Sequence, residues 1–523
     1  MRVFFILFLS TLFSGKIYVS LQMLDQVGIV DSETLELIDV IHTDFNDIST
    51  DCMNYSSEMD CNMATGCEWM MGMCMESSGS CMDYSSEMDC NMAAGCEWMM
   101  GMCMESSDSC MDYNSEMDCN MATGCEWMMG MCMESGGMQM GNNTPHFIAI
   151  DDINGYWFVT TIASGYVAQF ELITNNFVDK IFVGDSPALL TLNKHAKKIY
   201  CSRMMPMGSM MTGSESTIIH EIDYSGNMLM TSNEFEIPAP APHGIAINSN
   251  GSEVYVASNT ADWIYKIIPS SGDIIGSVMD DNIDNSPNIE TQRLKPIQCL
   301  SVGDSLLFVT CSGGQWFDPW TGNQEEIAGQ VQLWDSNAMI KLDTYEFDWY
   351  SSPWHIVNDK HDNRVYLALA GDGLYEGSSG VASLSYDNSN LSLDWFTSND
   401  VFDTLHGIDI SDEHEQIYVS GRGDGNLHVL NLSGDLINSI PLSVNGDMVM
   451  AGGVAFFSDY DQGNLNNDDL IDIFDIILLV SYILGNLENY NEILFNTSGD
   501  LNIDGSIDIL DVMLLANIIL NSN

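Results

Sequence analysis

The stretch "PHGIAINSNGSEVYVAS", Pro242–Ser258, joins a short apolar segment, a polar turn and a second segment rich in Val and Tyr. The same phrase returns at intervals of about 50 residues, at residues 145–161, 186–202, 296–311, 353–369 and 405–421. Further alternating segments follow most copies. Short strands at this period, separated by turn residues, are typical of β-propeller blades. The sequence therefore predicts a mainly β fold, with six complete blades.

A seventh blade is split between distant parts of the chain. "AGGVAFFSD" (Ala451–Asp459) has the pattern of a first strand, but no second strand follows it. "KIYVSLQMLDQVGIVDSETLELIDVI" (Lys16–Ile41) has the pattern of the three missing strands. Joining the two closes a seven-bladed ring by hydrogen bonds and removes an exposed sheet edge.

The repeated phrase resembles the blades of the YVTN (YncE-like) family of seven-bladed propellers. The resemblance covers residues 145–458, with residues 16–44 completing the closing blade. It implies the fold and does not imply a particular ligand or reaction.

The charge of the chain excludes one class of partner. Its 523 residues include 14 Lys and Arg against 75 Asp and Glu, a formal net charge of −61. Such a surface repels phosphate backbones, so we do not expect a nucleic-acid partner. It suits divalent cations and a salty medium, and the alternative is an acidic surface that serves solubility alone.

The first residues, "MRVFFILFLSTLFSG", have the pattern of a secretory signal peptide. Arg2 precedes the apolar run Val3–Phe13, which is too short to span a bilayer. We assign residues 1–15 to this leader. The mature protein is then expected outside the cell, on its surface or in the periplasm, and not as a membrane-spanning protein.

Residues 45–144 contain three Cys- and Met-rich repeats, spaced 29 residues apart from Cys52 to Cys81. Each has the frame C-x8-C-x5-C-x6-C, which in an exported chain predicts two disulfides per repeat with three open pairings. A unit this small needs such cross-links to fold, and a zinc site is the less favoured alternative. The cysteines concerned are Cys52, Cys61, Cys67, Cys74, Cys81, Cys90, Cys96, Cys103, Cys110, Cys119, Cys125 and Cys132. Cys201, Cys299 and Cys311 are expected to be buried thiols in propeller strands.

The methionines leave two interpretations open. Thioethers favour Cu(I), and "MMGMCM" and "RMMPMGSMM" have the spacing of exported copper-handling proteins. The copper ligands would be Met204, Met205, Met207, Met210 and Met211, on the same rim as His146, His243, His355 and His406 at the mouth of the central channel. The alternative is a duplicated module whose methionines serve packing or adhesive contact.

The C-terminal residues 459–523 contain two loops with the calcium-binding pattern, "NLNNDDLIDIFD" (Asn464–Asp475) and "DLNIDGSIDILD" (Asp500–Asp511). Oxygen ligands at loop positions 1, 3, 5, 7, 9 and 12 suit Ca²⁺, with a main-chain oxygen at position 7. In the first loop these are Asn464, Asn466, Asp468, Leu470, Asp472 and Asp475, and in the second Asp500, Asn502, Asp504, Ser506, Asp508 and Asp511. Asn464 and Asp469 depart from the pattern in the first loop, so we expect weaker binding there.

Each loop runs into an apolar helix, and this duplicated unit resembles a type I dockerin. The resemblance implies calcium-dependent folding and docking onto a cohesin partner, in assemblies that degrade polysaccharides. The recognition positions Ile473, Phe474, Ile509 and Leu510 are apolar here, whereas the best-known dockerins have hydroxyl side chains. The alternative is a C-terminal segment that calcium stabilises and that caps the protein, with its apolar helices packed on each other or on the propeller.

These features favour a secreted modular binding protein, with a propeller as recognition platform and a calcium-dependent docking domain. The first alternative is an exported copper-binding or copper-dependent redox protein. The second is a polysaccharide-active enzyme carried by the dockerin-like domain. No nucleophile elbow, phosphate loop or H-E-x-x-H motif is present, so we assign no catalytic residue.

Overall fold

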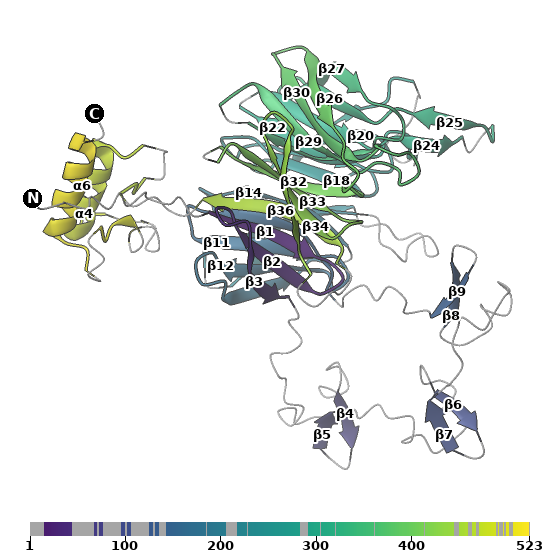
Figure 1. The fold of residues 1–523 in the computed structure, drawn as a ribbon, viewed down its shortest axis with the longest axis horizontal. Coiled ribbons are helices and arrows are strands. Elements are labelled where there is room, and N and C mark those ends of the chain that lie inside the picture. The colour runs from purple at the N-terminus through teal and green to yellow at the C-terminus, as the bar shows by residue number, and fades with distance from the viewer. Residues whose placement is uncertain are drawn as a thin grey trace, which may run out of the picture. The chain divides into compact units, whose positions relative to one another are not determined.

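The computed structural model describes most of the propeller, parts of the C-terminal segment and six short strands within residues 44–141 (Figure 1). The described ranges are 15–43, 143–184, 186–204, 217–226, 228–282, 291–303, 305–318, 321–359, 361–412, 414–443, 449–458, 463–466, 470–487, 490, 495, 498–501 and 506–521. The backbone of 67–70, 73–76, 96–99, 102–105, 125–128 and 131–134 is also described. The chain divides into two compact units, of which one is Asp44–Gly141 and the other holds the remaining residues.

Seven four-stranded antiparallel sheets form the blades of a propeller. Three of them follow the long insert: β10 (Pro145–Asp151), β11 (Tyr156–Thr161), β12 (Tyr166–Glu171) and β13 (Phe177–Phe182); β14 (Pro187–Asn193), β15 (Lys198–Arg203), β16 (Ile218–Asp223) and β17 (Met230–Glu236); β18 (Pro242–Ile247), β19 (Val254–Ser258), β20 (Trp263–Ile268) and β21 (Asp273–Val278). The next three are β22 (Pro296–Val302), β23 (Leu306–Cys311), β26 (Gln330–Asp335) and β27 (Ile340–Glu346); β28 (Pro353–Asn358), β29 (Arg364–Leu369), β30 (Gly380–Tyr386) and β31 (Leu391–Thr397); β32 (Leu405–Ser411), β33 (Gln416–Gly421), β34 (Asn426–Asn431) and β35 (Leu436–Pro441). A hairpin that the sequence did not predict, β24 (Gly314–Phe317) with β25 (Gln324–Ile327), extends from the blade that begins with β22.

The seventh blade combines the two ends of the propeller sequence, as predicted. Its strand order is β3 (Leu37–His42), β2 (Gln26–Asp31), β1 (Gly15–Leu21) and β36 (Ala451–Ser458). β1 pairs antiparallel with β36, from Gly15 opposite Ser458 to Leu21 opposite Ala451, and Figure 1 shows these two strands side by side. Gly15, which the sequence assigned to the leader, is the first residue of β1.

The ring is closed. Each inner strand contacts the inner strand of the next blade, in the order β36, β10, β14, β18, β22, β28 and β32, and β32 contacts β36 again. This continuous circuit confirms the seven-bladed propeller, which leaves no inner edge open to pairing with another chain.

Burial explains why the second strand of each blade is the most apolar part of the repeated phrase. All five residues of β19 are buried, and so are the last five residues of β11, β29 and β33. Outer strands such as β21 and β31 are mostly exposed. The second strand of a blade is covered on both faces by neighbouring blades, so it carries a continuous apolar run, whereas an outer strand tolerates polar residues.

Cys201 in β15, Cys299 in β22 and Cys311 in β23 are buried free thiols in propeller strands, as expected. Burial raises the pKa of the Cys201 thiol to about 12 and raises those of the other two as well. All three therefore stay protonated at neutral pH and act as small apolar side chains.

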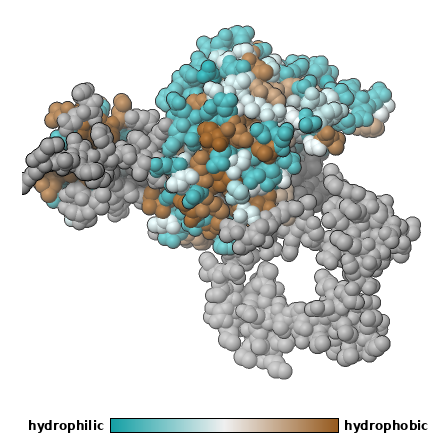
Figure 2. Space-filling view, viewed as in Figure 1, coloured by the Kyte–Doolittle hydropathy of each residue, from teal (hydrophilic) through white to brown (hydrophobic). Residues whose placement is uncertain are grey.

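Figure 2 shows that the visible outer face of the propeller is largely hydrophilic, with scattered apolar patches.

Six blades share an unusual backbone step. The residue just before the inner strand has a left-handed conformation, with φ between 44° and 54°, and none of the six is glycine. They are Thr144, Ser186, Ala241, Lys295, Ser352 and Thr404. Such a conformation is uncommon for residues with a Cβ and persists only where the surroundings fix it.

Two carboxylates show how this step is held. Asp262 accepts hydrogen bonds from the N–H groups of Arg293, Leu294 and Lys295, at 2.9, 3.1 and 3.0 Å. Asp25, in the turn between β1 and β2, accepts from the N–H groups of Asn143 and Thr144, at 2.9 and 2.7 Å. A carboxylate that caps consecutive N–H groups makes strong, charge-assisted hydrogen bonds, which offset the strained conformation.

The unit Asp44–Gly141 contains three two-stranded antiparallel hairpins with the same register. They are β4 (Cys67–Met70) with β5 (Met73–Glu76), β6 (Cys96–Met99) with β7 (Met102–Glu105), and β8 (Cys125–Met128) with β9 (Met131–Glu134). Each hairpin covers the "CEWMMGMCME" part of one repeat, so the three copies fold alike locally. The predicted disulfides involve side chains outside those that the structure describes, and their pairing stays open.

The C-terminal segment contributes two helices, α4 (Ile473–Ile483) and α6 (Ile509–Asn521). The two helices contact each other around a small core of Leu465, Leu479, Phe495 and Leu515. Asp472 caps the N-terminus of α4, because its side chain accepts from the N–H of Phe474. Within the described ranges, no helix is both long and apolar enough to cross a membrane.

Candidate functional site

Four histidines meet at one end of the channel, where their inner strands begin. His146, His243, His355 and His406 stand near the starts of β10, β18, β28 and β32. Each is at most 6% exposed. The ring of His406 lies 5.1 Å from that of His146 and 4.7 Å from that of His355, and His146 lies 6.5 Å from His243, all between ring centres. The structure thus gathers the four imidazoles that the sequence placed at the channel mouth.

Two aromatic side chains pack against the histidine cluster, the name we use for these four residues. The ring of Phe147 stacks on His355 from a blade on the other side of the ring, 6.0 Å between centres, and Trp354 packs edge-on against His406 at 5.0 Å. Aromatic rings thus pack against two of the four imidazoles.

Two of the four imidazoles are oriented by hydrogen bonds. The amide Nε2 of Gln22, from the split blade, lies 2.8 Å from Nδ1 of His146. Nδ1 of His243 donates to the carbonyl oxygen of Ile297 at 2.6 Å. Nε2 of His146 and Nδ1 of His406 are both buried and make no hydrogen bond within the described chain. Buried polar atoms are nearly always paired, so these two nitrogens point to a further binding partner, of which water is the simplest.

The histidine cluster is uncharged at neutral pH. Burial is the main cause that lowers the pKa of all four histidines, and that of His355 falls to about 3. Neighbouring histidines lower the pKa of His146, His355 and His406 further, because a second positive charge nearby is unfavourable. Neutral imidazoles can each offer one N–H donor and one nitrogen lone pair.

Arg422 lies beside the cluster, a neighbour that the sequence did not reveal. It follows β33 directly, and its N–H donates to the carbonyl of Thr404 at 3.0 Å, two residues before His406 in the chain. Its charge lowers the pKa of both His146 and His406. Burial lowers the pKa of Arg422 itself, although part of the residue is accessible to solvent.

Arg422 differs from the other described arginines in having no side-chain partner. Arg203 bonds to His220 at 3.0 Å, Arg293 to Glu325 at 2.6 Å and Arg364 to Asp362 at 3.0 Å. Among the residues that the structure describes, no hydrogen bond or ion pair reaches the Arg422 guanidinium. The only sequence signal was "SGRGDG", a basic residue in the turn that follows a second strand.

The copper hypothesis stays a prediction. Met204 packs against the core between two blades, and Met205, Met207, Met210 and Met211 lie outside the described residues, so their common rim with the histidines is not tested. Over the ranges that are described, no three His, Cys, Asp or Glu side chains are already grouped as a metal site.

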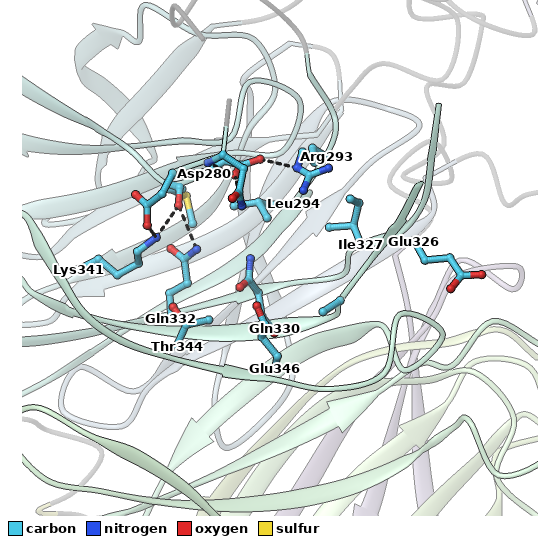
Figure 3. Close-up of a pocket in the computed structure, with 14 residues that line it drawn as sticks. Asp280, Arg293, Leu294, Glu326, Ile327, Gln330, Gln332, Lys341, Thr344 and Glu346 are labelled. Carbon is cyan, nitrogen blue, oxygen red and sulfur yellow. Dashed lines mark hydrogen bonds and ion pairs between the residues drawn. The ribbon is translucent and has the colours of Figure 1, made fainter. Parts of the chain in front are cut away.

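A separate pocket of about 340 Å³ lies between the blades that begin with β18 and β22, next to the β24–β25 hairpin (Figure 3). Its cationic side chains already have partners. Lys341 Nζ lies 2.6 Å from an oxygen of Asp281 and donates to the carbonyl of Met279, and Arg293 Nε lies 2.8 Å from Asp280, close enough for an ion pair though not aligned as a hydrogen bond. The pocket thus offers less unsatisfied charge to a ligand than Arg422 does.

The two C-terminal loops have the same pattern of internal hydrogen bonds. Asp475 and Asp511, at loop position 12, are both fully buried. In each loop one carboxylate oxygen accepts from the N–H at position 2 (2.7 Å from Leu465, 2.9 Å from Leu501). The other oxygen accepts at 2.8 Å from the N–H at position 9, of Asp472 or Asp508. The N–H at position 11 in turn donates to the position-9 carboxylate at 2.7 Å.

The donor set in these loops fits a calcium ion. Asp475 and Asp511 are buried carboxylates, and residues 459–523 contain no Lys, Arg or His that could neutralise them. A buried charge requires an opposite charge or a metal ion, and clustered carboxylate, amide and carbonyl oxygens are the ligands that Ca²⁺ prefers. Asn464, Asp472, Asp500 and Asp508 lie in the described part of the loops, as do Asn466, Leu470 and Ser506, while Asp468, Asn502 and Asp504 lie outside it.

Comparisons with known proteins give a limited result. No family model and no curated protein matches the chain. Among solved structures, hydrazine synthase from Kuenenia stuttgartiensis is 13% identical with a TM-score of 0.43, over 57% of this chain and 86% of that one. A putative 6-phosphogluconolactonase from Bacteroides uniformis is 13% identical with a TM-score of 0.43, over 60% and 88%. A virginiamycin B lyase from Staphylococcus aureus, solved with quinupristin in a catalytically inactive form, is 14% identical with a TM-score of 0.42, over 61% and 92%.

None of these likenesses bears on the ligand or activity of this chain. Its strand topology alone establishes the seven-bladed propeller. Membership in the YVTN family and in the dockerin family stays a prediction from resemblance.

Proposed function

We propose that the protein is a secreted binding protein whose C-terminal segment folds around two calcium ions, while its propeller serves as a recognition platform. The observation that carries the calcium part is the matched network around Asp475 and Asp511. Both carboxylates are buried, both are held by the same backbone donors, and neither has a basic side chain available within residues 459–523.

Bound calcium would bring positive charge to a segment, residues 459–523, that contains no Lys, Arg or His. Asp475 and Asp511, at position 12, would close the coordination shell from the first turns of α4 and α6. Because each helix starts within its loop, an ion held there would fix the direction of the helix. Binding and folding of this segment would then be coupled, and chelation would loosen the small core around Leu479 and Leu515.

The outer surface of the helix pair supports a docking role. Ile473, Phe474, Ile509 and Leu510, at equivalent positions of the two loops and helices, are between 50% and 62% exposed. Large exposed apolar side chains that recur at equivalent positions suit a protein partner, for which a cohesin-like domain is the expectation from the dockerin resemblance. A role in polysaccharide degradation or cell-surface assembly would follow from that partner, and no catalytic residue is proposed.

Calorimetry on the full-length protein tests the calcium part. After removal of metals with a chelator, titration with Ca²⁺ should show two sites, and Mg²⁺ should bind much more weakly because it accepts large, flexible oxygen shells poorly. Asp511→Asn should abolish one site, or weaken it by at least about tenfold, which is 1.4 kcal/mol. Glu415→Gln, an exposed propeller carboxylate, is the matched control and should bind as the wild type does. Unchanged calcium uptake by an Asp475→Asn, Asp511→Asn double variant would refute the proposal.

A further inference from the structure

The guanidinium of Arg422 is the starting point, because no residue that the structure describes pairs with its charge. Arg422 is partly buried, and its N–H donates to the carbonyl of Thr404, two residues before His406; no acidic side chain or carbonyl pairs with its guanidinium in the described part of the chain. This is unexpected in a protein with 75 acidic residues against 14 basic ones. Removing an arginine from water is costly unless an anion compensates it, so the site favours an anionic ligand.

The histidine cluster provides further hydrogen-bond donors. The Gln22 amide is placed to donate to Nδ1 of His146, so Nε2 of that ring carries the proton and has no acceptor. Nδ1 of His406 is likewise buried without a partner. The two ring centres lie 5.1 Å apart. The two rings contact each other edge to face, so both nitrogens without a partner belong to one packed group of imidazoles.

We propose that Arg422, His146 and His406 form a carboxylate-binding site at the mouth of the propeller channel. The guanidinium would take the carboxylate through its two parallel N–H donors, and the two imidazoles would bind the same group from the channel side. The proposal names a ligand class for the recognition platform and rests on that half of the proposed function alone; calcium binding by residues 459–523 is independent of it.

Charge selects the carboxylate among oxyanions. The site carries one positive charge, that of Arg422, because the histidines are neutral. A monoanion balances this charge, whereas a phosphate dianion would add excess negative charge to a chain whose formal net charge is −61. The same guanidinium disfavours a metal cation on the histidines.

Access to the site is from solvent. Arg422 is partly accessible, whereas the histidines behind it are at most 6% exposed. A ligand would therefore present its acidic group to the channel end while the rest of the molecule stays outside. This arrangement suits a sugar acid or another carboxylate at the end of a larger molecule.

Saturation-transfer NMR on the full-length, calcium-loaded protein tests the proposal, with acetate and galacturonate as probes and inorganic phosphate as competitor. Both carboxylates should bind, and Arg422→Gln should weaken binding by at least about tenfold. Arg422→Lys, which keeps the charge and loses the paired donors, should fall between the two. Arg364→Gln removes the same charge from a partly exposed position on β29 and should have no effect.

Three results would overturn the proposal. The first is the absence of carboxylate binding by a wild-type sample that takes up calcium normally, which separates this failure from a failure of the calcium part. The second is equal binding by Arg422→Gln and Arg364→Gln, or phosphate binding that is tighter than carboxylate binding. The third is stoichiometric Cu²⁺ or Zn²⁺ uptake that is lost in His406→Asn and retained in Arg422→Gln, which would assign the cluster to a metal. Should Arg422→Gln fail to fold by circular dichroism, Arg422→Lys and His406→Asn decide the question.

Discussion

Ring closure by the two ends of the propeller sequence makes a quantitative prediction for Ile17. This residue lies in β1 opposite Phe456 of β36, is completely buried, and belongs to the core that the split blade shares with β33 and β34. Ile17→Ala removes three carbon groups, worth about 0.8 kcal/mol each. With the cavity left behind, we expect a loss of about 3 kcal/mol in the free energy of unfolding, within the usual range for such a change.

Two matched variants set the scale. Ile219→Ala alters an equally buried isoleucine in β16, inside an unbroken blade, and should cost the same amount. Ile437→Ala alters an isoleucine in β35 that is 49% exposed and should cost less than about 0.5 kcal/mol. Urea unfolding at saturating calcium, followed by circular dichroism in the β-sheet region, measures all three.

The comparison between Ile17 and Ile219 decides the matter. If β1 and β36 pair as their register indicates, Ile17→Ala and Ile219→Ala unfold at the same urea concentration and in one transition. A cost below about 0.5 kcal/mol for Ile17→Ala, with the expected cost for Ile219→Ala, would refute the closure. So would an early transition in Ile17→Ala that releases only the first strands.

Two further predictions follow from the channel end and the insert. Because burial lowers the pKa of His355 to about 3, the unfolded chain binds a proton below about pH 6.5 that the folded protein does not, so stability should fall as the pH drops from about 6.5 towards 3. Urea unfolding at pH 7.5 and 5.0 should show this loss, and His355→Asn should reduce it by up to about 1.4 kcal/mol per pH unit; an identical pH profile would contradict the assignment. Deleting residues 44–141 and joining Thr43 to Asn142 with a short Gly-Ser linker should leave the propeller folded, with a cooperative melt and unchanged calcium uptake. Aggregation of that variant would show that the ring depends on the insert.

The propeller could be predicted because its signal is repeated. Apolar runs such as that of β19 recur with each blade, since each second strand is buried on both faces, and "AGGVAFF" without a successor indicated the split blade. The position of histidine just after Pro145 and Pro242 placed two imidazoles at equivalent points, so their convergence was also predictable. Repetition converts a weak local pattern into a strong global one.

The role of Arg422 could not be predicted in the same way. Only the ring geometry brings the turn after β33 to His146, a residue 276 positions away in a different blade (422 less 146). The hairpin of β24 and β25 was missed for another reason, because its strands occur once and lack the apolar alternation of the blades. Single features that depend on tertiary contacts leave no period in the sequence.

Asp25 has a consequence for how this chain can change in length. Its backbone carbonyl accepts from the N–H of Thr43 at 2.7 Å, and its carboxylate accepts from the N–H of Asn143 at 2.9 Å. The residues that flank the insert 44–141 on either side are therefore both hydrogen-bonded to Asp25. Lengthening a loop whose ends are already joined is inexpensive, about 0.6 kcal/mol for each doubling. Whole copies of the Cys- and Met-rich repeat can therefore be gained or lost while the seven-bladed propeller keeps its fold. The number of repeats, three in this chain, can therefore change during evolution without a change in the propeller fold.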